Sequence, residues 1–174
     1  MSYRNLELDS EFVISLKRQD DKAFETLFHA CAGFVFSIAM GLLGRRSAAE
    51  DAVQEIFFKA YKALPEFKGE KLSPWLGKIA HNHCIDLLRQ TKREVPTAVT
   101  PVEDLNLSQS NSVSEELPDF INALSVSERE VVILKKVEGL SYKEISQLTG
   151  KKEGTLRNIV LKSLQFLREK VDES

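Results

Sequence analysis

The sequence predicts an all-α protein with two small helical domains joined by a flexible acidic linker, the second a four-helix domain containing a helix-turn-helix. Apolar residues recur at spacings of three and four through most of the chain, which is the period of an amphipathic helix. The β-branched residues fall mainly at the same spacing, so no strand is expected. One segment, residues 95–112, has prolines, small polar residues and no aromatic side chain, which is typical of a linker.

The first domain, residues 1–94, is predicted to contain four helices. The first covers about residues 10–18, and Asp20 or Asp21 then caps a second helix that reaches about Leu43. This second helix has a wide apolar face and should form the core. The residues of that face are Phe24, Leu27, Phe28, Cys31, Phe34, Val35, Ile38 and Leu42.

A third helix is predicted to begin at Ser47 and to continue to about Leu64, because Ser47 and Glu50 have the spacing of a capping box. One face of this helix is apolar and should pack. Its other face is polar, and taken alone it would be interpreted as a solvated surface. The polar residues are Asp51, Gln54, Glu55 and Lys59.

A loop and a fourth helix complete the first domain. Residues 65–72 contain a helix-stopping proline, and Phe67 has no apolar stripe to join, so the loop is a candidate binding segment. Ser73 is expected to cap the fourth helix. On that helix Asn82 and Asp86 fall on or beside the apolar stripe, so they are either buried in a polar network or face a ligand. The basic end of the helix would bind an anionic partner or complement the helix dipole, and consists of Arg89, Lys92 and Arg93.

The second domain, residues 114–174, follows a linker at residues 95–113. A short helix near its start precedes a longer one, for which Ser125 and Glu128 form a second capping box. Gly139 is expected to end that longer helix.

The last two predicted helices form a helix-turn-helix. Ser141 and Glu144 make a third capping box, and Gly150 ends the helix in a left-handed turn. The next helix carries polar and basic side chains away from its apolar stripe. DNA is the first hypothesis for their partner, with a merely solvated face as the competing interpretation. The side chains are Arg157, Asn158, Lys162 and Arg168.

Composition limits the classes of function. The net charge of -2 argues against a protein that coats nucleic acid without specificity, and the bases are concentrated in residues 151–170. The longest apolar run, residues 34–43, is far shorter than the ~20 residues that span a bilayer, and the amino terminus has no signal pattern. A cytoplasmic protein without direct membrane insertion is therefore expected.

Neither a metal nor another cofactor is expected. The run from His81 to Cys84 contains three candidate ligands, but residues two apart on a helix point in different directions and no fourth ligand is near. Cys31 and Cys84 both lie in apolar helical patterns, so buried reduced thiols without a disulfide are expected. The chain also lacks a glycine-rich phosphate loop, a nucleophile with its base and paired carboxylates, so an enzyme with a small-molecule substrate is not expected.

Three stretches suggest a family. They are AEDAVQEIFFKAYKAL at residues 49–64, WLGKIAHNHCIDLLR at residues 75–89, and LSVSEREVVILKKVEGLSYKEISQLTG with EGTL at residues 124–150 and 153–156. Together they resemble the extracytoplasmic-function group of bacterial sigma factors, the smallest members of the sigma-70 family. The resemblance covers residues 24–171, and two modules in this order carry more weight than a lone helix-turn-helix.

The resemblance implies a dissociable specificity subunit of RNA polymerase that selects promoters and aids DNA melting. On the first domain it implies a surface for the clamp helices of the largest polymerase subunit. A second surface would engage the minus-ten element, where an unstacked base needs polar groups and single-stranded backbone needs cations. The clamp residues would be Asp51, Gln54, Glu55 and Phe58. The minus-ten residues would be Phe67, Lys68, Gly69, Lys71, Lys78, His81, Asn82, Arg89 and Arg93.

The helix-turn-helix would, by the same resemblance, contact the minus-thirty-five element as duplex in the major groove. Further implied partners are the polymerase flap and an anti-sigma factor, which in this family is often anchored in the membrane. Ile159 and Leu164 stand where the family often has arginine, and with Phe166 they widen the apolar arc, which is expected to face the first domain or a regulator. The minus-thirty-five residues would be Lys152, Thr155, Arg157, Asn158 and Lys162.

The competing function is a stand-alone helix-turn-helix regulator whose first domain senses a ligand or dimerises. Such a regulator would bind duplex DNA tightly by itself, whereas a sigma factor binds promoters mainly within the holoenzyme. A gel-shift assay with and without core polymerase separates the two.

Overall fold

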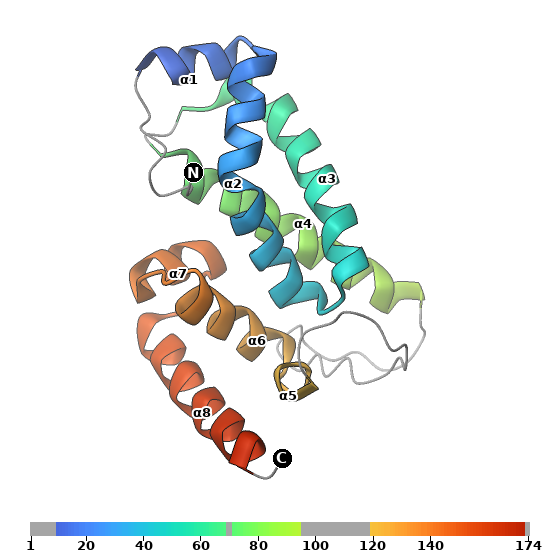
Figure 1. The fold of residues 1–174 in the computed structure, drawn as a ribbon, viewed down its shortest axis with the longest axis vertical. Coiled ribbons are helices and arrows are strands. Elements are labelled where there is room, and N and C mark those ends of the chain that lie inside the picture. Colours follow the sequence, from blue (N-terminus) through green and yellow to red (C-terminus); the bar gives the residue numbers. More distant parts are fainter. Residues whose placement is uncertain (1–9, 69–70, 95–118, 173–174) are drawn as a thin grey trace.

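The computed structural model describes residues 10–68, 71–94 and 119–172, and every element within them is helical. The first domain contains α1 (Ser10–Lys17), α2 (Asp21–Leu43), α3 (Arg46–Ala63), a 3-10 turn (Leu64–Glu66) and α4 (Leu72–Glu94). The second contains α5 (Asp119–Asn122), α6 (Val126–Val132), a π-helical turn (Ile133–Val137), α7 (Tyr142–Thr149) and α8 (Glu153–Asp172). Figure 1 shows the two groups of helices, with α2 reaching from the first toward the second. The predicted all-α class is confirmed, and the predicted linker lies outside the described residues.

Helix α2 forms the centre of the protein, as its wide apolar face predicted. Leu27 and Ile38 on that face have no exposed surface, and α3, α4 and α6 all pack against the helix. The carboxylate of Asp20 caps its start by accepting a hydrogen bond from the Ala23 N–H at 2.9 Å. By length and composition α2 is the one described helix that could cross a membrane, although 56% of its apolar window is buried inside the protein.

Two of the three predicted capping boxes are confirmed. The hydroxyls of Ser125 and Ser141 accept hydrogen bonds from the backbone N–H three residues later, and the Glu128 and Glu144 carboxylates accept from the serine N–H in return. The box at Ser47 is wrong, because α3 begins one residue earlier and Arg45 occupies the capping position without a side-chain bond. The carboxylate that would complete this box, on Glu50, instead accepts a hydrogen bond from Arg46 Nε at 2.8 Å.

Ser125→Ala and Ser141→Ala are each expected to lower the free energy of unfolding by about 1 kcal/mol, because each removes a bond to an otherwise unpaired helix amide. Ser47→Ala is the matched control, since its hydroxyl caps no helix. That control should change the free energy by less than about 0.5 kcal/mol. Urea denaturation of the three variants measures these values, and equal effects at all three positions would contradict the assignment.

The expectation that Phe67 has no core to join is also wrong. Its side chain is only 3% exposed and packs edge-on against Trp75, with 5.1 Å between the ring centroids. The chain turns back after the 3-10 turn, so the ring meets the first turn of α4. Helix α4 itself begins at Leu72, which places Ser73 inside the helix rather than at the predicted cap. The contact between Phe67 and Trp75 therefore packs the start of α4 against the core.

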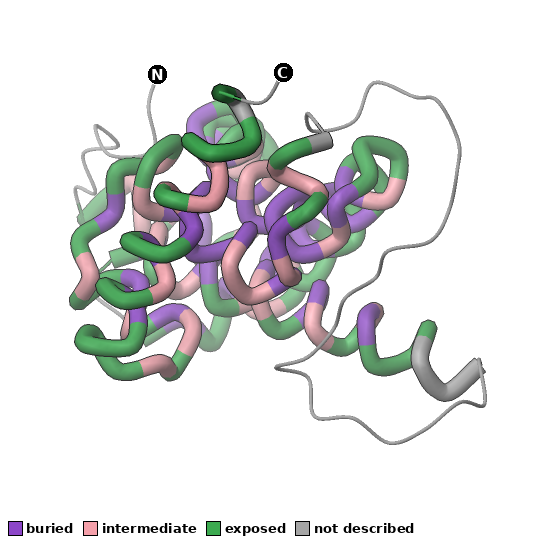
Figure 2. The backbone as a smooth tube through the Cα atoms, turned by 90° about the horizontal axis from the view of Figure 1, so that it is seen from below, coloured by how far each residue is buried: buried purple, intermediate pink, exposed green. Residues whose placement is uncertain are grey.

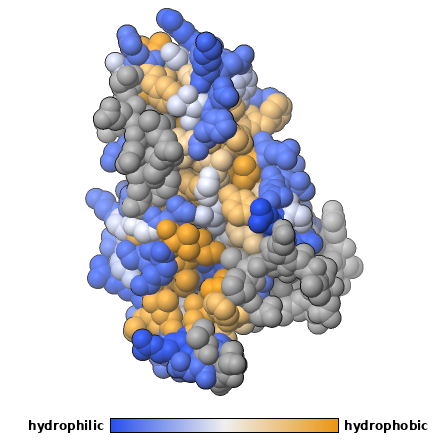
Figure 3. Space-filling view, in the orientation of Figure 1, coloured by the Kyte–Doolittle hydropathy of each residue, from blue (hydrophilic) through white to orange (hydrophobic). Residues whose placement is uncertain are grey.

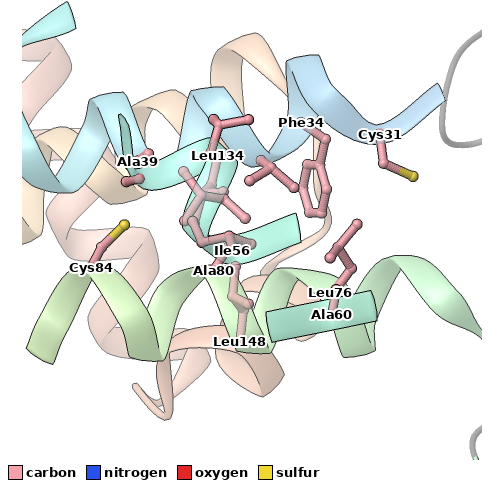
Figure 4. Close-up of a cluster of buried hydrophobic side chains, with 14 of the residues drawn as sticks. Cys31, Phe34, Ala39, Ile56, Ala60, Leu76, Ala80, Cys84, Leu134 and Leu148 are labelled. Atoms are coloured by element: carbon pink, nitrogen blue, oxygen red, sulfur yellow. The ribbon is translucent and has the colours of Figure 1, made fainter. Parts of the chain in front are cut away.

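The two domains share one hydrophobic core. Leu134 and Leu148 of the second domain join the same cluster of buried side chains as Phe34 and Leu76 of the first. Figure 4 shows these side chains between α2, α4 and the second domain, and Figure 2 shows that the buried segments gather in the middle of the protein. The two domains consequently form one packed body in this structure.

Both cysteines lie in that core, as predicted, and both are free thiols. Burial raises the pKa of Cys31 to about 11 and that of Cys84 to about 12. At neutral pH neither side chain is a thiolate, so neither is a reactive nucleophile.

Candidate polymerase and nucleic-acid interfaces

The outer face of α3 exposes the four residues that the sequence assigned to the polymerase clamp. The helix buries alanine, valine, isoleucine and phenylalanine on its inner face, and this turns the polar residues outward. Phe58 is 60% exposed, and Lys62 Nζ lies 4.1 Å from the centroid of its ring. An aromatic ring this exposed is suited to anchoring a partner. The four exposed residues are Asp51, Gln54, Glu55 and Phe58.

A buried histidine on α4 lies beneath this face. His83 Nδ1 is 2.7 Å from Lys59 Nζ, and His83 Nε2 is 3.3 Å from Glu55 Oε2. The ammonium can only donate, so Nδ1 accepts and the ring is neutral with its hydrogen on Nε2. Nε2 lies near Glu55 but outside hydrogen-bond geometry, and it has no hydrogen-bond partner among the described residues. This cluster holds the Lys59 and Glu55 side chains next to each other on α3.

Lowering the pH is expected to destabilise the protein through His83. Burial first, and then Lys59, lowers the pKa of His83 below its ordinary value of 6.5. The unfolded chain therefore takes up this proton at a higher pH than the folded chain, and the free energy of unfolding falls as the pH drops below 6.5. Denaturation of wild type and His83→Gln at about pH 7.5 and about pH 5.5 measures the difference. The variant should lose less stability between the two pH values, and an equal loss would contradict the assignment.

The residues assigned to the minus-ten element divide into four groups. Lys68, Lys71, Asn82 and Arg89 are exposed, and Asn82 and Arg89 lie on one face of α4 because seven residues separate them. The structure does not place Phe67 on that surface, since its ring is buried. Gly69 lies outside the described residues, as does the Arg93 side chain. The remaining two are Lys78 and His81.

Lys78 and His81 both contact the second domain, although Lys78 as a whole is exposed to solvent. Lys78 Nζ donates a hydrogen bond to the Leu148 carbonyl of α7 at 2.8 Å. His81 Nδ1 lies 2.6 Å from Glu130 Oε1 of α6, and both side chains are largely buried. Asp86, for which burial and ligand contact were both open, is exposed and forms an ion pair with Arg89 at 3.6 Å.

Helix α8 presents the residues assigned to the minus-thirty-five element. It packs on α7 and buries Leu156 and Val160, after Gly150 has made the turn with a φ of 77°. Thr155, Asn158 and Lys162 are exposed along one face of α8, and Lys152 is exposed just before the helix. The guanidinium of Arg157 is exposed but lies 5.1 Å from the Tyr142 ring and 3.6 Å from the Glu153 carboxylate.

The wide apolar arc of α8 packs mainly within its own domain. Ile159 and Leu164 are half-buried against the core, and the principal packing partners of α8 are α5, α6 and α7. Leu161, by contrast, is 69% exposed. Figure 3 shows apolar surface over the helices of the second domain. The main contacts of α8 lie within the second domain, and the alternative that the apolar arc meets a regulator stays a prediction.

Among the described residues, no group of three or more His, Cys, Asp or Glu side chains is arranged to hold a metal ion. The three candidate ligands at residues 81–84 lie in three different surroundings. Lys59 and Glu130 lie against His83 and His81 respectively, and Cys84 is in the core.

Sequence reasoning missed Arg129 and Glu130, which are buried charged residues of α6. Arg129 Nε donates to the Gly41 carbonyl at 2.8 Å, and its Nη2 donates to the Leu42 carbonyl at 3.3 Å. A signal was present, because the two residues lie three and four positions after Val126 on the apolar stripe of the helix. Charged side chains at core positions require partners, which the other domain supplies.

Comparisons with known proteins match both parts of the chain to sigma-factor regions. Residues 27–94 match the family model of Sigma-70 region 2, and residues 114–167 match that of Sigma-70, region 4. The first match contains the outer face of α3 and the exposed face of α4. The second contains the helix-turn-helix.

Curated relatives cover most of the chain. The RNA polymerase sigma factor CarQ of Myxococcus xanthus is 31% identical over 87% of this chain and 90% of its own. The ECF RNA polymerase sigma factor SigM of Bacillus subtilis is 28% identical over 77% of this chain and 86% of its own. SigE of Mycolicibacterium smegmatis is 29% identical over 84% of this chain, which spans 61% of that longer relative.

Solved structures share the fold. The sigma factor RpoE of Bartonella quintana, solved in complex with the anti-sigma factor NepR, superposes with a TM-score of 0.70 at 25% identity, covering 87% of this chain and 98% of its own. CnrH, solved in complex with the cytosolic domain of CnrY, has the same fold, with a TM-score of 0.65 at 19% identity over 95% of this chain and 98% of its own. Two sigma regions in order on one chain, together with a sigma factor that is 31% identical over nearly its whole length, show that this protein belongs to the family of extracytoplasmic-function sigma factors.

Proposed function

We propose that this protein is an alternative sigma factor that binds core RNA polymerase and directs promoter-specific transcription initiation. The observation that carries the proposal is the succession of Sigma-70 region 2 and region 4 on one chain. Residues 1–94 would form the region 2 domain and residues 114–174 the region 4 domain, joined by the linker at residues 95–113. Both matched regions belong to a DNA-binding regulatory subunit, so the stand-alone regulator is not favoured.

The outer face of α3 is the proposed contact with the clamp helices of the largest polymerase subunit. An exposed aromatic ring that is buried on binding typically dominates the energy of an interface, and Phe58 is such a ring. The carboxylates of Asp51 and Glu55 would steer the face toward basic side chains of the clamp. The region 4 domain would bind the polymerase flap.

The minus-ten element is proposed to bind along α4 and the loop before it. The exposed ammonium groups of Lys68 and Lys71 suit single-stranded backbone, and the Asn82 amide can donate to and accept from a base edge. Arg89 is proposed to extend this cationic surface, and Gly69 and Arg93 remain part of the proposal. The buried Phe67 ring supports the loop from beneath.

The minus-thirty-five element is proposed to bind α8 in the major groove. Asn158 and Lys162 lie one turn apart on its exposed face, with Thr155 on the same face and Lys152 before it. Arg157 stands on the flank of this face next to Tyr142.

An anti-sigma factor is the proposed regulator, and the complex of RpoE with NepR supports a partner of this kind. A cytoplasmic location follows from the proposed assembly with polymerase. A regulator with a membrane anchor and a cytosolic domain would fit that location.

Transcription in vitro with core polymerase on a promoter library tests the proposed function. Wild-type protein should produce defined start sites that core polymerase alone does not produce. A gel-shift assay should show promoter binding mainly when core polymerase is present. Absence of defined start sites without any inhibitor, or tight duplex binding by the protein alone, would overturn the proposal.

A further inference from the structure

Glu55 and Lys59 on the outer face of α3 have the spacing of a direct ion pair. They are four residues apart with the glutamate first, which is the favourable order for a pair on a helix surface. The ion pairs among the described residues do not include this one. Lys59 Nζ lies instead 2.7 Å from Nδ1 of His83, and Glu55 Oε2 lies 3.3 Å from Nε2 of the same ring. The histidine ring therefore separates two charges that would otherwise meet.

His83 reaches this face from beneath. Its side chain is 5% exposed, and α4, on which it lies, packs against α3. Nε2 is buried and has no hydrogen-bond partner among the described residues. A buried N–H without an acceptor is unfavourable, and the Glu55 carboxylate is an acceptor within reach. The unpaired Nε2–H therefore attracts the Glu55 side chain toward α4.

The two contacts fit only one form of the imidazole. The Lys59 ammonium can only donate, so Nδ1 must carry a lone pair, and the single hydrogen of a neutral ring then lies on Nε2. That tautomer presents a lone pair to the cation and an N–H to the anion. A protonated ring would instead direct an N–H at the ammonium, and the other neutral tautomer would do the same. The arrangement of Lys59 and Glu55 therefore depends on the protonation of His83.

Keeping the two charges apart leaves them available to a partner. The Glu55 side chain is 65% exposed, and with Asp51 one turn earlier it supplies the negative charge of the proposed clamp contact. If Glu55 paired with Lys59, each charge would neutralise the other, and the attraction of this face for a basic surface would fall. The separation by His83 thus matters for binding as well as for packing.

We propose that His83 is a positioning residue of the polymerase-binding face, because its neutral ring keeps Glu55 and Lys59 apart and leaves both charges available to the partner. A proton on the ring destroys this arrangement. It repels the Lys59 ammonium from Nδ1 and draws the Glu55 carboxylate toward the new charge. Affinity for core polymerase should therefore fall in acid. The inference rests on the proposed function for this consequence, but the His83 cluster itself, defined as Glu55, Lys59 and His83, can be tested in the free protein.

The pH range of this effect follows from the surroundings of the ring. Burial, the largest influence, and then Lys59 lower the pKa of His83 below its ordinary value of 6.5, while Glu55 and Asp86 act in the opposite direction. The ring is therefore neutral above pH 6.5, and the arrangement is lost as the pH falls through the lowered pKa of the folded protein. Lys59→Met removes the cation next to Nδ1 and keeps an unbranched side chain. It should raise the pKa of His83 and move the loss to a higher pH.

Nuclear magnetic resonance of the free protein tests the His83 cluster without polymerase. In protein with isotope-labelled histidine, the two ring nitrogens report which of them carries the hydrogen and at what pH the ring titrates. Wild type should show the hydrogen of His83 on Nε2 at about pH 7.5 and a titration midpoint below 6.5. Lys59→Met should raise that midpoint. A hydrogen on Nδ1, or a midpoint that Lys59→Met leaves unchanged, would overturn the cluster.

Two substitutions of His83 separate its hydrogen bonds from its proton. His83→Leu removes both ring nitrogens and places an apolar side chain in a buried position. His83→Gln keeps a donor and an acceptor, but its amide takes up no proton near neutral pH. His29→Leu is the matched control, because His29 also lies next to a glutamate, Glu25 at 3.7 Å, but its side chain is 72% exposed on α2. Circular dichroism establishes that each variant is folded.

Titration of fluorescent sigma factor with core polymerase between about pH 7.5 and about pH 5 measures the consequence. At the higher pH, His83→Leu should weaken binding by about threefold or more, and His83→Gln should weaken it less. Wild type should lose about threefold or more in affinity as the pH falls, and both His83 variants should lose less. His29→Leu should match wild type at each pH. In Lys59→Met the loss should begin at a higher pH than in wild type.

A folded His83→Leu protein with wild-type affinity and a wild-type pH profile would overturn the positioning role. An equal loss of affinity in His83→Leu and His83→Gln, with the pH profile of wild type, would show a structural role only and would also overturn it. A wild-type protein that has the expected tautomer but binds no core polymerase at any pH would overturn the proposed function and leave the His83 cluster standing. The two failures are therefore distinguishable.

Discussion

Phe58→Ala is expected to weaken binding to core RNA polymerase by about 30-fold or more. Removing a central aromatic anchor from an interface typically lowers the binding free energy by about 2 kcal/mol or more, which corresponds to that factor. The ring is 60% exposed in the free protein, so its loss should leave the melting temperature almost unchanged. Titration of fluorescent sigma factor with core polymerase measures the dissociation constant.

Ile14→Ala is the matched control for this substitution. Ile14 is an apolar side chain that is 47% exposed on α1, outside both the α3 face and the region 4 domain. It tests whether any loss of exposed apolar surface weakens polymerase binding. Wild-type affinity for Phe58→Ala, or an equal loss for both variants, would show that the α3 face is not the principal contact.

Local sequence signals predicted most of the helices, because period and capping act within a few residues. The apolar period of α2 and the boxes at Ser125 and Ser141 were both confirmed. The box at Ser47 failed for an equally local reason, since the Glu50 carboxylate bonds with the Arg46 side chain at a spacing of four. The Glu50 carboxylate could accept a hydrogen bond either from the Ser47 backbone or from the Arg46 side chain, and the sequence alone does not show which bond forms.

Tertiary contacts explain the features that the sequence did not predict. A single aromatic residue in a loop has no period, so the burial of Phe67 against Trp75 depends on how the chain turns back after α3. Residue type alone predicts that charged side chains such as Arg129 and Glu130 are exposed. Their burial depends on unpaired carbonyls at the end of α2 and on His81, which are far away along the chain.

The proposed binding surfaces also combine features that local sequence predicts with features that depend on tertiary contacts. The outward direction of Asp51, Gln54, Glu55 and Phe58 follows from the period of α3, and the structure exposes all four. The resemblance assigned Lys78 to DNA because of its charge and position on α4. In the structure Lys78 donates to a carbonyl at the end of α7 in the other domain. This contact depends on how the two domains pack together, which the local sequence of α4 does not reveal.

Asn158→Ala is expected to reduce discrimination at one base pair of the minus-thirty-five element. A side-chain amide that bonds to a base edge in the major groove contributes about 1–3 kcal/mol of discrimination, which is roughly 5-fold to 150-fold. Lys162→Ala should act differently, because a phosphate contact lowers affinity to a similar degree for all sequences and reduces the salt dependence. Transcription by the reconstituted holoenzyme from promoters that vary at each position of the element measures both effects.

Gln165→Ala is the matched control for Asn158→Ala, because Gln165 is an exposed amide on the same face of α8, two turns further along. Lys22→Ala is the control for Lys162→Ala, because it removes an exposed ammonium from α2, far along the chain from the helix-turn-helix. Both controls should retain wild-type promoter preference. Since α8 packs on its own domain through other residues, Asn158→Ala should also keep wild-type polymerase affinity. An unchanged preference at every position of the element would show that α8 does not contact base edges through Asn158, and the proposed docking of this helix would then be wrong.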